Sequence, residues 1–321
     1  MTVKRGRILG FLGVLLCFSS CASQRMAASA EEYFSIGMAY FELGKYAEAE
    51  QWLNRAKMVD KTRTASQYNL GRIAFETGRY GEAVKIFDKI LEKDPDNVMT
   101  LQAAAYTRIK TGELAEAEAL YDRVLRLVPE SADDGYNYAL VLYALDKPGQ
   151  AEAVLEKYHF ALAENDDSLL LFARAQAKQN KVEAADSYSQ WLANNSDPLV
   201  RHEYAQVLEK AGLYARALEE YRETLGTLSQ DNAKLTRPAV RYAIARLLLF
   251  ADPENDEGIT ELRTAVSEGF SGMDMIRALL DHPGISGAHK DDIRRILDEG
   301  VPAASPESEG DVEGGADGSQ E

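Results

Sequence analysis

Small and bulky apolar residues recur along this chain with a period of thirty-four residues. Four alanines share that step, and each lies four positions before a bulky apolar residue. The alanines are Ala49, Ala83, Ala117 and Ala151, and the bulky residues are Leu53, Phe87, Tyr121 and Leu155. Gly44, Gly78 and Gly112 follow the same step. A period of this length with two helical stripes in each unit predicts an all-α solenoid of helix-turn-helix repeats.

The repeat pattern sets the expected organisation of the chain. Four units in register begin near residues 30, 64, 98 and 132. A fifth, over about 166–197, loses register, and a sixth ends near 225 with its marker Ala217 thirty-two residues after Ala185. We expect the array over 30–225, a degenerate helix pair and capping helices over 226–300, and a disordered acidic tail over 301–321.

The first unit carries a known motif. Its small, aromatic and bulky aliphatic residues follow in the order Gly37, Tyr40, Gly44, Tyr46, Ala49, Leu53 and Ala56. This order over residues 30–61 resembles the tetratricopeptide repeat, with Lys61 in place of the usual terminal Pro. The resemblance implies a superhelical solenoid of about six to seven repeats, closed by a C-terminal capping helix, whose first helices line a concave groove.

The N-terminus has the pattern of an export signal. A basic segment that ends at Arg7 precedes an apolar run over residues 8–18, and small residues follow. This arrangement is typical of a secretory signal peptide, and the run is too short to span a bilayer comfortably. We therefore expect a signal peptide over residues 1–20.

The end of that run resembles a bacterial lipobox, in which a peptidase cleaves before a cysteine that carries diacylglycerol. Cys21 is the matching cysteine, and Phe18 stands where the common pattern has Leu. The resemblance implies a lipidated tether over 21–29 and a lipid-anchored protein of the bacterial cell envelope, on its periplasmic face. The alternative is cleavage after Ala30, which follows an A-x-A pattern and would release the chain without an anchor.

Composition and charge narrow the classes of partner. The formal net charge of −16 argues against a nucleic-acid partner, because phosphate contacts require clustered Lys and Arg. Both cysteines, Cys17 and Cys21, lie in the first twenty-one residues, so no disulfide framework is expected in the folded part.

We find no motif for catalysis, a cofactor or a metal, and expect none of the three. Gly44-Lys45 lacks the other residues of a phosphate-binding loop, and Gln206 stands where the second histidine of an H-E-x-x-H zinc motif would follow His202. The acidic loop at residues 252–257 departs from the calcium-loop ligand pattern. Function is therefore expected in the surface of the solenoid.

The first helices supply the candidate binding residues. The thirty-four-residue step places them in stripes along the expected groove, rich in aromatic, Met and Arg side chains, which anchor many protein interfaces. The predicted groove residues are Phe34, Met38, Tyr68, Arg72, Gln102, Tyr106, Tyr136, Leu140 and Tyr143. The alternative is that part of each stripe, especially Phe41 and Phe75, packs between helices.

The family resemblance also permits a negative expectation. Chaperone-binding members hold a terminal carboxylate with Lys, Asn and Arg side chains, and the matching positions here agree only at Asn69. We therefore expect no carboxylate clamp.

The sequence favours a non-enzymatic scaffold or adaptor that binds a protein partner through its concave groove and the membrane through its N-terminal lipid. Two alternatives remain. One is an accessory protein of a transport system that binds a small apolar ligand, possibly as an oligomer. The other is an enzyme with an unrecognised site in residues 226–300.

Overall fold

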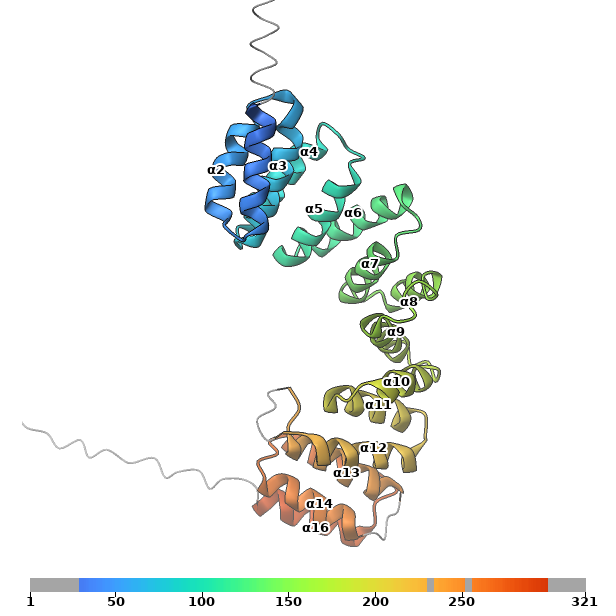
Figure 1. Cartoon of the computed structure of the whole chain (residues 1–321). Helices are drawn as coiled ribbons and strands as arrows, with labels where there is room; N and C mark the ends of the chain where they lie inside the picture. The colour runs from blue at the N-terminus through green and yellow to red at the C-terminus, as the bar shows by residue number, and fades with distance from the viewer. Residues whose placement is uncertain (1–28, 230–233, 252–255, 300–321) are drawn as a thin grey trace, which may run out of the picture. The chain divides into compact units, whose positions relative to one another are not determined.

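A computed structural model describes residues 29–229, 234–251 and 256–299, and these residues are helical and contain no strand (Figure 1). The expected all-α helical repeat solenoid is confirmed. The signal sequence, Cys21 and the acidic tail lie outside the described residues. None of the described helices has the length and apolar content that a membrane span requires. Contacts divide the chain into two compact units, unit 1 over Met1–Ser187 and unit 2 over Tyr188–Glu321.

Unit 1 contains successive pairs of antiparallel helices joined by short turns. A first helix over residues 29–42 precedes α2 (Tyr46–Ala56), α3 (Asp60–Glu76), α4 (Tyr80–Leu91), α5 (Val98–Thr111), α6 (Leu114–Leu127), α7 (Ala132–Ala144), α8 (Pro148–Lys157) and α9 (Asp166–Lys178). The next helix, α10 (Ala184–Asn194), contains the boundary between the two units.

The marker residues of the repeat form the core of unit 1. Ala83 is fully buried, and Phe87 is 1% exposed. A Cβ added at Gly71 would lie 2.6 Å from the Phe87 ring, so the first helix of that pair approaches the second too closely for any side chain there. The periodic small and bulky residues therefore set the helix spacing, as the sequence predicts.

The turn inside each pair of unit 1 contains a residue in the left-handed conformation. Gly112, which follows α5, has φ +81°, a conformation that glycine adopts without steric cost. Asp146 replaces this glycine in the fourth pair and has φ +59°, while Asn180 has φ +56° in the fifth. Asp and Asn tolerate this region better than other side chains, so the turn survives both replacements.

A buried carboxylate connects the fourth pair to the fifth. Glu152 on α8 is 8% exposed and accepts hydrogen bonds from Gln176 (3.3 Å), Gln179 (2.7 Å) and Lys181 (2.6 Å). Burial alone would raise its pKa, but the hydrogen bonds from Lys181 and the two glutamines, with the Lys181 charge, lower the pKa of Glu152 below its ordinary value. The charged form is therefore the one that the fold stabilises.

We expect Glu152→Gln to remove a pH-dependent part of the stability of unit 1. A carboxyl with a lowered folded pKa stabilises the fold above its unfolded pKa of about 4.3, and that stabilisation disappears as the pH falls through the folded value. The loss at neutral pH should be about 1.5–3 kcal/mol, the range for hydrogen bonds to charged groups. Urea unfolding between neutral and acidic pH measures it. Glu116→Gln, at an exposed position on α6, is the control, and equal effects of the two variants would contradict the assignment.

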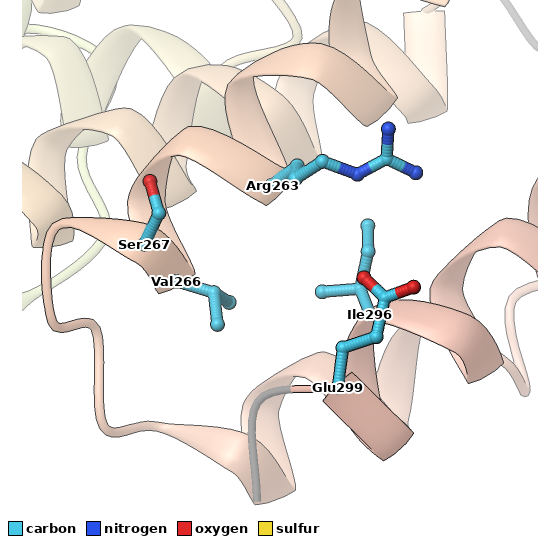
Figure 2. A pocket seen from close by; sticks show the side chains of 5 residues that line it. All are labelled: Arg263, Val266, Ser267, Ile296 and Glu299. Carbon is cyan, nitrogen blue, oxygen red and sulfur yellow. The ribbon is translucent and has the colours of Figure 1, made fainter.

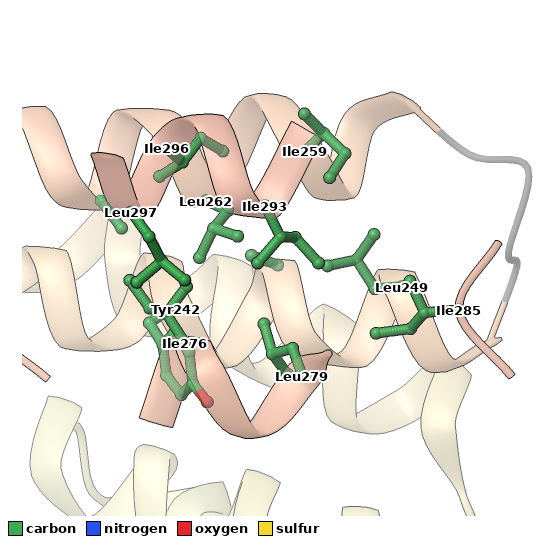
Figure 3. Packing of buried hydrophobic residues seen from close by; sticks show 12 residues of the cluster. Tyr242, Leu249, Ile259, Leu262, Ile276, Leu279, Ile285, Ile293, Ile296 and Leu297 are labelled. Carbon is green, nitrogen blue, oxygen red and sulfur yellow. The ribbon is translucent and has the colours of Figure 1, made fainter. Parts of the chain in front are cut away.

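Unit 2 continues with helix pairs and ends in a cap. After α10 come α11 (Pro198–Lys210), α12 (Tyr214–Thr227), α13 (Arg237–Ala251), α14 (Asp256–Ser267), α15 (Met273–Leu279) and α16 (Gly287–Glu299). Apolar residues of α13, α14, α15 and α16 form one buried cluster, in which Leu262, Ile276 and Ile293 are fully buried (Figure 3). The Tyr242 hydroxyl donates a 3.0 Å hydrogen bond to the Met275 carbonyl oxygen. The last two helices thus cover the apolar face of the last pair, which is the role expected of a capping segment.

Candidate functional site: the first-helix face of unit 1

All nine predicted groove residues lie in unit 1, on the first helix of a pair. Phe34 and Met38 lie on the helix over residues 29–42, and the others lie on α3, α5 and α7. We call these nine residues the first-helix face. The structure separates them into side chains that pack between helices and side chains that remain open to solvent.

The stripe of Phe34, Tyr68, Gln102 and Tyr136 is largely occupied by packing. Phe34 packs against the cluster that contains Leu53, and the Tyr68 ring centroid lies 5.9 Å from that of Phe87. Gln102 Nε2 donates a 2.6 Å hydrogen bond to Asp134 Oδ2 on the next first helix. Tyr136 is half-buried, and burial raises the pKa of its hydroxyl. These side chains position the helices.

The stripe that contains Tyr143 also takes part in packing. This stripe also contains Phe41 and Phe75. The Phe41 ring centroid lies 5.6 Å from that of Tyr46, and the Phe75 ring centroid lies 5.3 Å from that of Tyr80. The alternative that Phe41 and Phe75 pack between helices is therefore the arrangement found. Tyr143 is half-buried, and the Lys178 ammonium lies 4.9 Å from its ring centroid.

The middle stripe of Met38, Arg72, Tyr106 and Leu140 is the most open. Tyr106 is 42% exposed and Leu140 is 36% exposed, whereas Met38 and Arg72 are half-buried. The guanidinium of Arg72 lies 4.4 Å from the Phe41 ring centroid and donates to Asn69 Oδ1 at 3.2 Å. The Asn69 side chain thus forms hydrogen bonds within α3, since its amide Nδ2 also donates to the Ala65 carbonyl oxygen at 2.9 Å.

Equivalent side chains of successive repeats meet in the same way. Arg72 lies over Phe41, and Tyr106 contacts Phe75 with ring centroids 5.4 Å apart. Both members of the second pair are thirty-four residues beyond those of the first. On α3 and α5 the repeat therefore brings the middle-stripe residue against an aromatic side chain of the preceding first helix.

Cations lie over the aromatic rings of this face. The Lys110 ammonium is 5.3 Å from the Tyr106 ring centroid, and Lys178 lies over Tyr143. Lys178 also forms a 2.6 Å ion pair with Asp146, whose side chain is 79% exposed. The hydrogen bond from Lys178 to Asp146 raises the pKa of the Lys178 ammonium. The face therefore combines open apolar side chains with positive charge.

Sequence reasoning missed three contributors to this surface. Met99 is 60% exposed on α5, seven residues before Tyr106, and therefore on the same side of that helix. Lys110 directly follows Ile109, which belongs to the stripe that contains Tyr143. The thirty-four-residue step from Leu140 reaches Arg174 on α9. Extending the stripes to the fifth repeat and including neighbouring exposed positions would have found all three.

Titratable groups in unit 2 form ion pairs between helices. Arg246 donates to both carboxylate oxygens of Glu209 at 2.7 Å, and the Tyr221 hydroxyl donates to the same carboxylate at 3.0 Å. Arg241 lies between Glu261 (2.8 Å) and Glu268 (2.9 Å). These pairings place the charged side chains in contacts between packed helices.

A small cavity lies between α14 and α16. Its volume is about 240 Å³, and its lining residues are Arg263, Val266, Ser267, Ile296 and Glu299 (Figure 2). Small-molecule pockets usually have volumes of about 300–1,000 Å³. The cavity contains none of the predicted groove residues, and it does not favour the small-ligand alternative. Within the described ranges, no group of three or more His, Cys, Asp and Glu side chains is arranged to hold a metal ion.

Comparisons with known proteins identify the repeat. The family model described as tetratricopeptide repeat matches residues 40–108 and 74–140. A second model, described as anaphase-promoting complex, cyclosome, subunit 3, matches residues 110–190. A search of curated proteins finds no match to this chain.

Two solved structures share the fold at low sequence identity. A tetratricopeptide repeat protein from Parabacteroides merdae is 20% identical, with 79% of this chain and 98% of that chain covered and a TM-score of 0.53. A crystal structure of MamA protein is 17% identical, with 55% of this chain and 98% of that chain covered and a TM-score of 0.50. Residues 40–140 therefore match the tetratricopeptide repeat, and the chain shares the helical repeat fold of these solved structures.

Proposed function

We propose that this chain is a scaffold that binds a segment of a partner protein on the first-helix face of unit 1. The observation that carries the proposal is the open middle stripe, where Tyr106 and Leu140 remain exposed although aromatic side chains of the neighbouring stripes pack between helices. Exposed aromatic and aliphatic side chains on a rigid repeat surface are suited to anchoring a partner. Packing of the surrounding stripes holds these anchors in fixed positions, which reduces the entropy lost on binding.

We further propose that the scaffold is held at a membrane of the bacterial cell envelope by lipid on Cys21. Support comes from the sequence alone, in the basic segment, the apolar run and the Phe18-Ser19-Ser20-Cys21 order. Acyl chains on the cysteine would insert by burying methylene groups at about 0.8 kcal/mol each. The residues between Cys21 and the first helix would then separate the repeats from the bilayer.

Site-specific crosslinking in cells tests the binding face. A photoreactive phenylalanine analogue is placed at Leu140 (36% exposed) or, as the matched control, at Leu127 (41% exposed), near the end of the second helix α6. We expect a partner protein to crosslink from position 140 and not from 127. Tyr106→Ser should reduce that crosslink about ten-fold or more, because central aromatic anchors contribute about 2 kcal/mol or more to binding.

Two results would refute the scaffold proposal. One is equal crosslinking from positions 127 and 140, which would indicate nonspecific contact. The other is a position-140 crosslink that Tyr106→Ser leaves unchanged, since the exposed stripe would then contribute nothing. Far-ultraviolet circular dichroism of each variant establishes that the helices remain folded.

A further inference from the structure

We infer that the segment bound by the first-helix face is extended and acidic, with apolar side chains between carboxylates. This inference rests on the proposed function and adds the chemistry of the partner. Two observations on α5, α7 and α9 support it. The first is which of their apolar side chains are exposed to solvent, and the second is where their lysines lie.

The apolar part of the surface covers two neighbouring repeats. Met99 and Tyr106 are exposed on α5, and Leu140 is exposed on α7, one repeat further along. The ring contact with Phe75 on the preceding first helix holds the Tyr106 side chain in place. A partner must therefore supply apolar side chains to cover this area, because burial of apolar surface is the main favourable contribution to association.

The positive part flanks the apolar part. Lys110 is exposed beside Tyr106, and no ion pair to Lys110 occurs within the part of the chain that the structure describes. Lys178 lies on α9, and within the described residues its ion pair is with the exposed Asp146. An exposed pair of this kind contributes little stability, so a carboxylate of a partner can replace Asp146 at small cost.

These cations are notable in a chain with 52 acidic and 36 basic residues. A partner with positive charge would be attracted to most of the surface, but at this face it would meet lysines beside the apolar anchors. A segment with carboxylates would be repelled by most of the chain, including the aspartates in the first turns of α7 and α9, and attracted at the lysines in the last turns of α5 and α9. Charge therefore favours an acidic segment at this face and disfavours it elsewhere, which restricts where it binds.

Helix geometry offers a simpler explanation for the lysines, and it must be tested. Cations are favoured near helix C-termini by the helix dipole, and Lys110 lies in the last turn of α5. Lys89 is also exposed and lies in the last turn of α4, a second helix. It therefore provides a control with the same dipole environment and a different face.

The repeat spacing sets the expected spacing in the partner. First helices of successive repeats contact each other through side chains, as Gln102 does with Asp134, which places them about 10 Å apart. An extended chain advances about 3.3 Å per residue, so one repeat corresponds to about three residues. Lys110 and Lys178 lie two repeats apart, with Leu140 on the helix between them. The matching segment has carboxylates about six positions apart with an apolar residue midway between them.

Binding of designed peptides to the full chain tests the inference. Three fluorescent peptides of about twelve residues share leucines at and beside the midpoint and differ only at two positions about six apart, which are Asp, Asn or Lys. Fluorescence anisotropy should show the Asp peptide binding about five- to thirty-fold more tightly than the Asn peptide, with the Lys peptide weakest. Higher salt should reduce the difference.

Variants then assign the charge effect to this face. We expect the double variant Lys110→Gln and Lys178→Gln to remove the preference for the Asp peptide while Lys89→Gln retains it. Equal binding of the three peptides, binding of none of them, or equal effects of Lys89→Gln and the double variant would overturn the inference. Each result leaves the scaffold proposal intact if the Tyr106-dependent crosslink from position 140 persists, whereas loss of that dependence refutes the scaffold itself.

Discussion

Replacing Phe87 by alanine should lower the free energy of unfolding of unit 1 by about 3–5 kcal/mol, the range for truncating a large buried aromatic side chain. Phe87 is 1% exposed and fills the space beside Gly71, where the two helices of the second pair approach closely. Truncation leaves a cavity that Gly71, without a side chain, cannot fill. The variant therefore loses both the transfer free energy of the ring and the contacts around it.

The same substitution at an exposed position provides the control. Phe160 is 87% exposed in the segment after α8, so Phe160→Ala should change the free energy of unfolding by no more than about 0.5 kcal/mol. Urea unfolding measures both variants. Because repeat arrays unfold through neighbouring blocks, hydrogen exchange of α3 and α4 amides should show the largest loss of protection in Phe87→Ala. Similar effects of the two substitutions would contradict the role of Phe87 as the repeat's packing residue.

The fold was predictable because its determinants are local and repeated. In every unit, a small alanine lets the neighbouring helix approach, and a bulky residue four positions later fills the space beside it. Ala83 and Phe87 therefore indicate helix packing without knowledge of the other repeats. The residue that forms the turn could also be predicted from the sequence. Where Gly is replaced, Asp146 adopts the same left-handed conformation, so an apparent break in the pattern preserves the structure.

The candidate site was only partly predictable from the sequence. Periodicity places Tyr68, Gln102 and Tyr106 on the same kind of helix, but exposure depends on which side chains of the neighbouring repeat cover them. Tyr68 lies beside Phe87, and Gln102 bonds to Asp134, whereas Tyr106 stays open. Their role in partner binding stays a prediction.

Contacts between residues far apart in the sequence could not be predicted. Glu152 is a polar residue at a buried position, and nothing in its local sequence shows that Gln176, Gln179 and Lys181 will surround it. The division between the units inside α10 likewise depends on how many contacts cross it. The sequence shows only that register weakens in the fifth repeat.

Replacing Cys21 by serine should abolish lipid attachment and move the folded chain out of the lipid-anchored fraction. A serine hydroxyl cannot replace the thiol that would receive the diacylglycerol. Without acyl chains the anchor loses about 0.8 kcal/mol for each methylene no longer buried, and stable anchoring requires more than one chain. In a bacterium that processes lipoproteins, the wild-type chain should incorporate labelled fatty acid and the Cys21→Ser chain should incorporate none.

Cys17→Ser is the matched control, because it makes the same change four residues earlier, inside the apolar run. It should leave both the label and the membrane fraction unchanged. Retained hydrophobic signal could also hold an unprocessed Cys21→Ser chain in the membrane, so intact mass is the deciding measurement. The anchor proposal requires a wild-type chain that begins at Cys21 with the added mass of acyl chains. An unmodified wild-type chain beginning at Glu31 would instead establish cleavage after Ala30, and the repeats would then reach their partner without a lipid anchor.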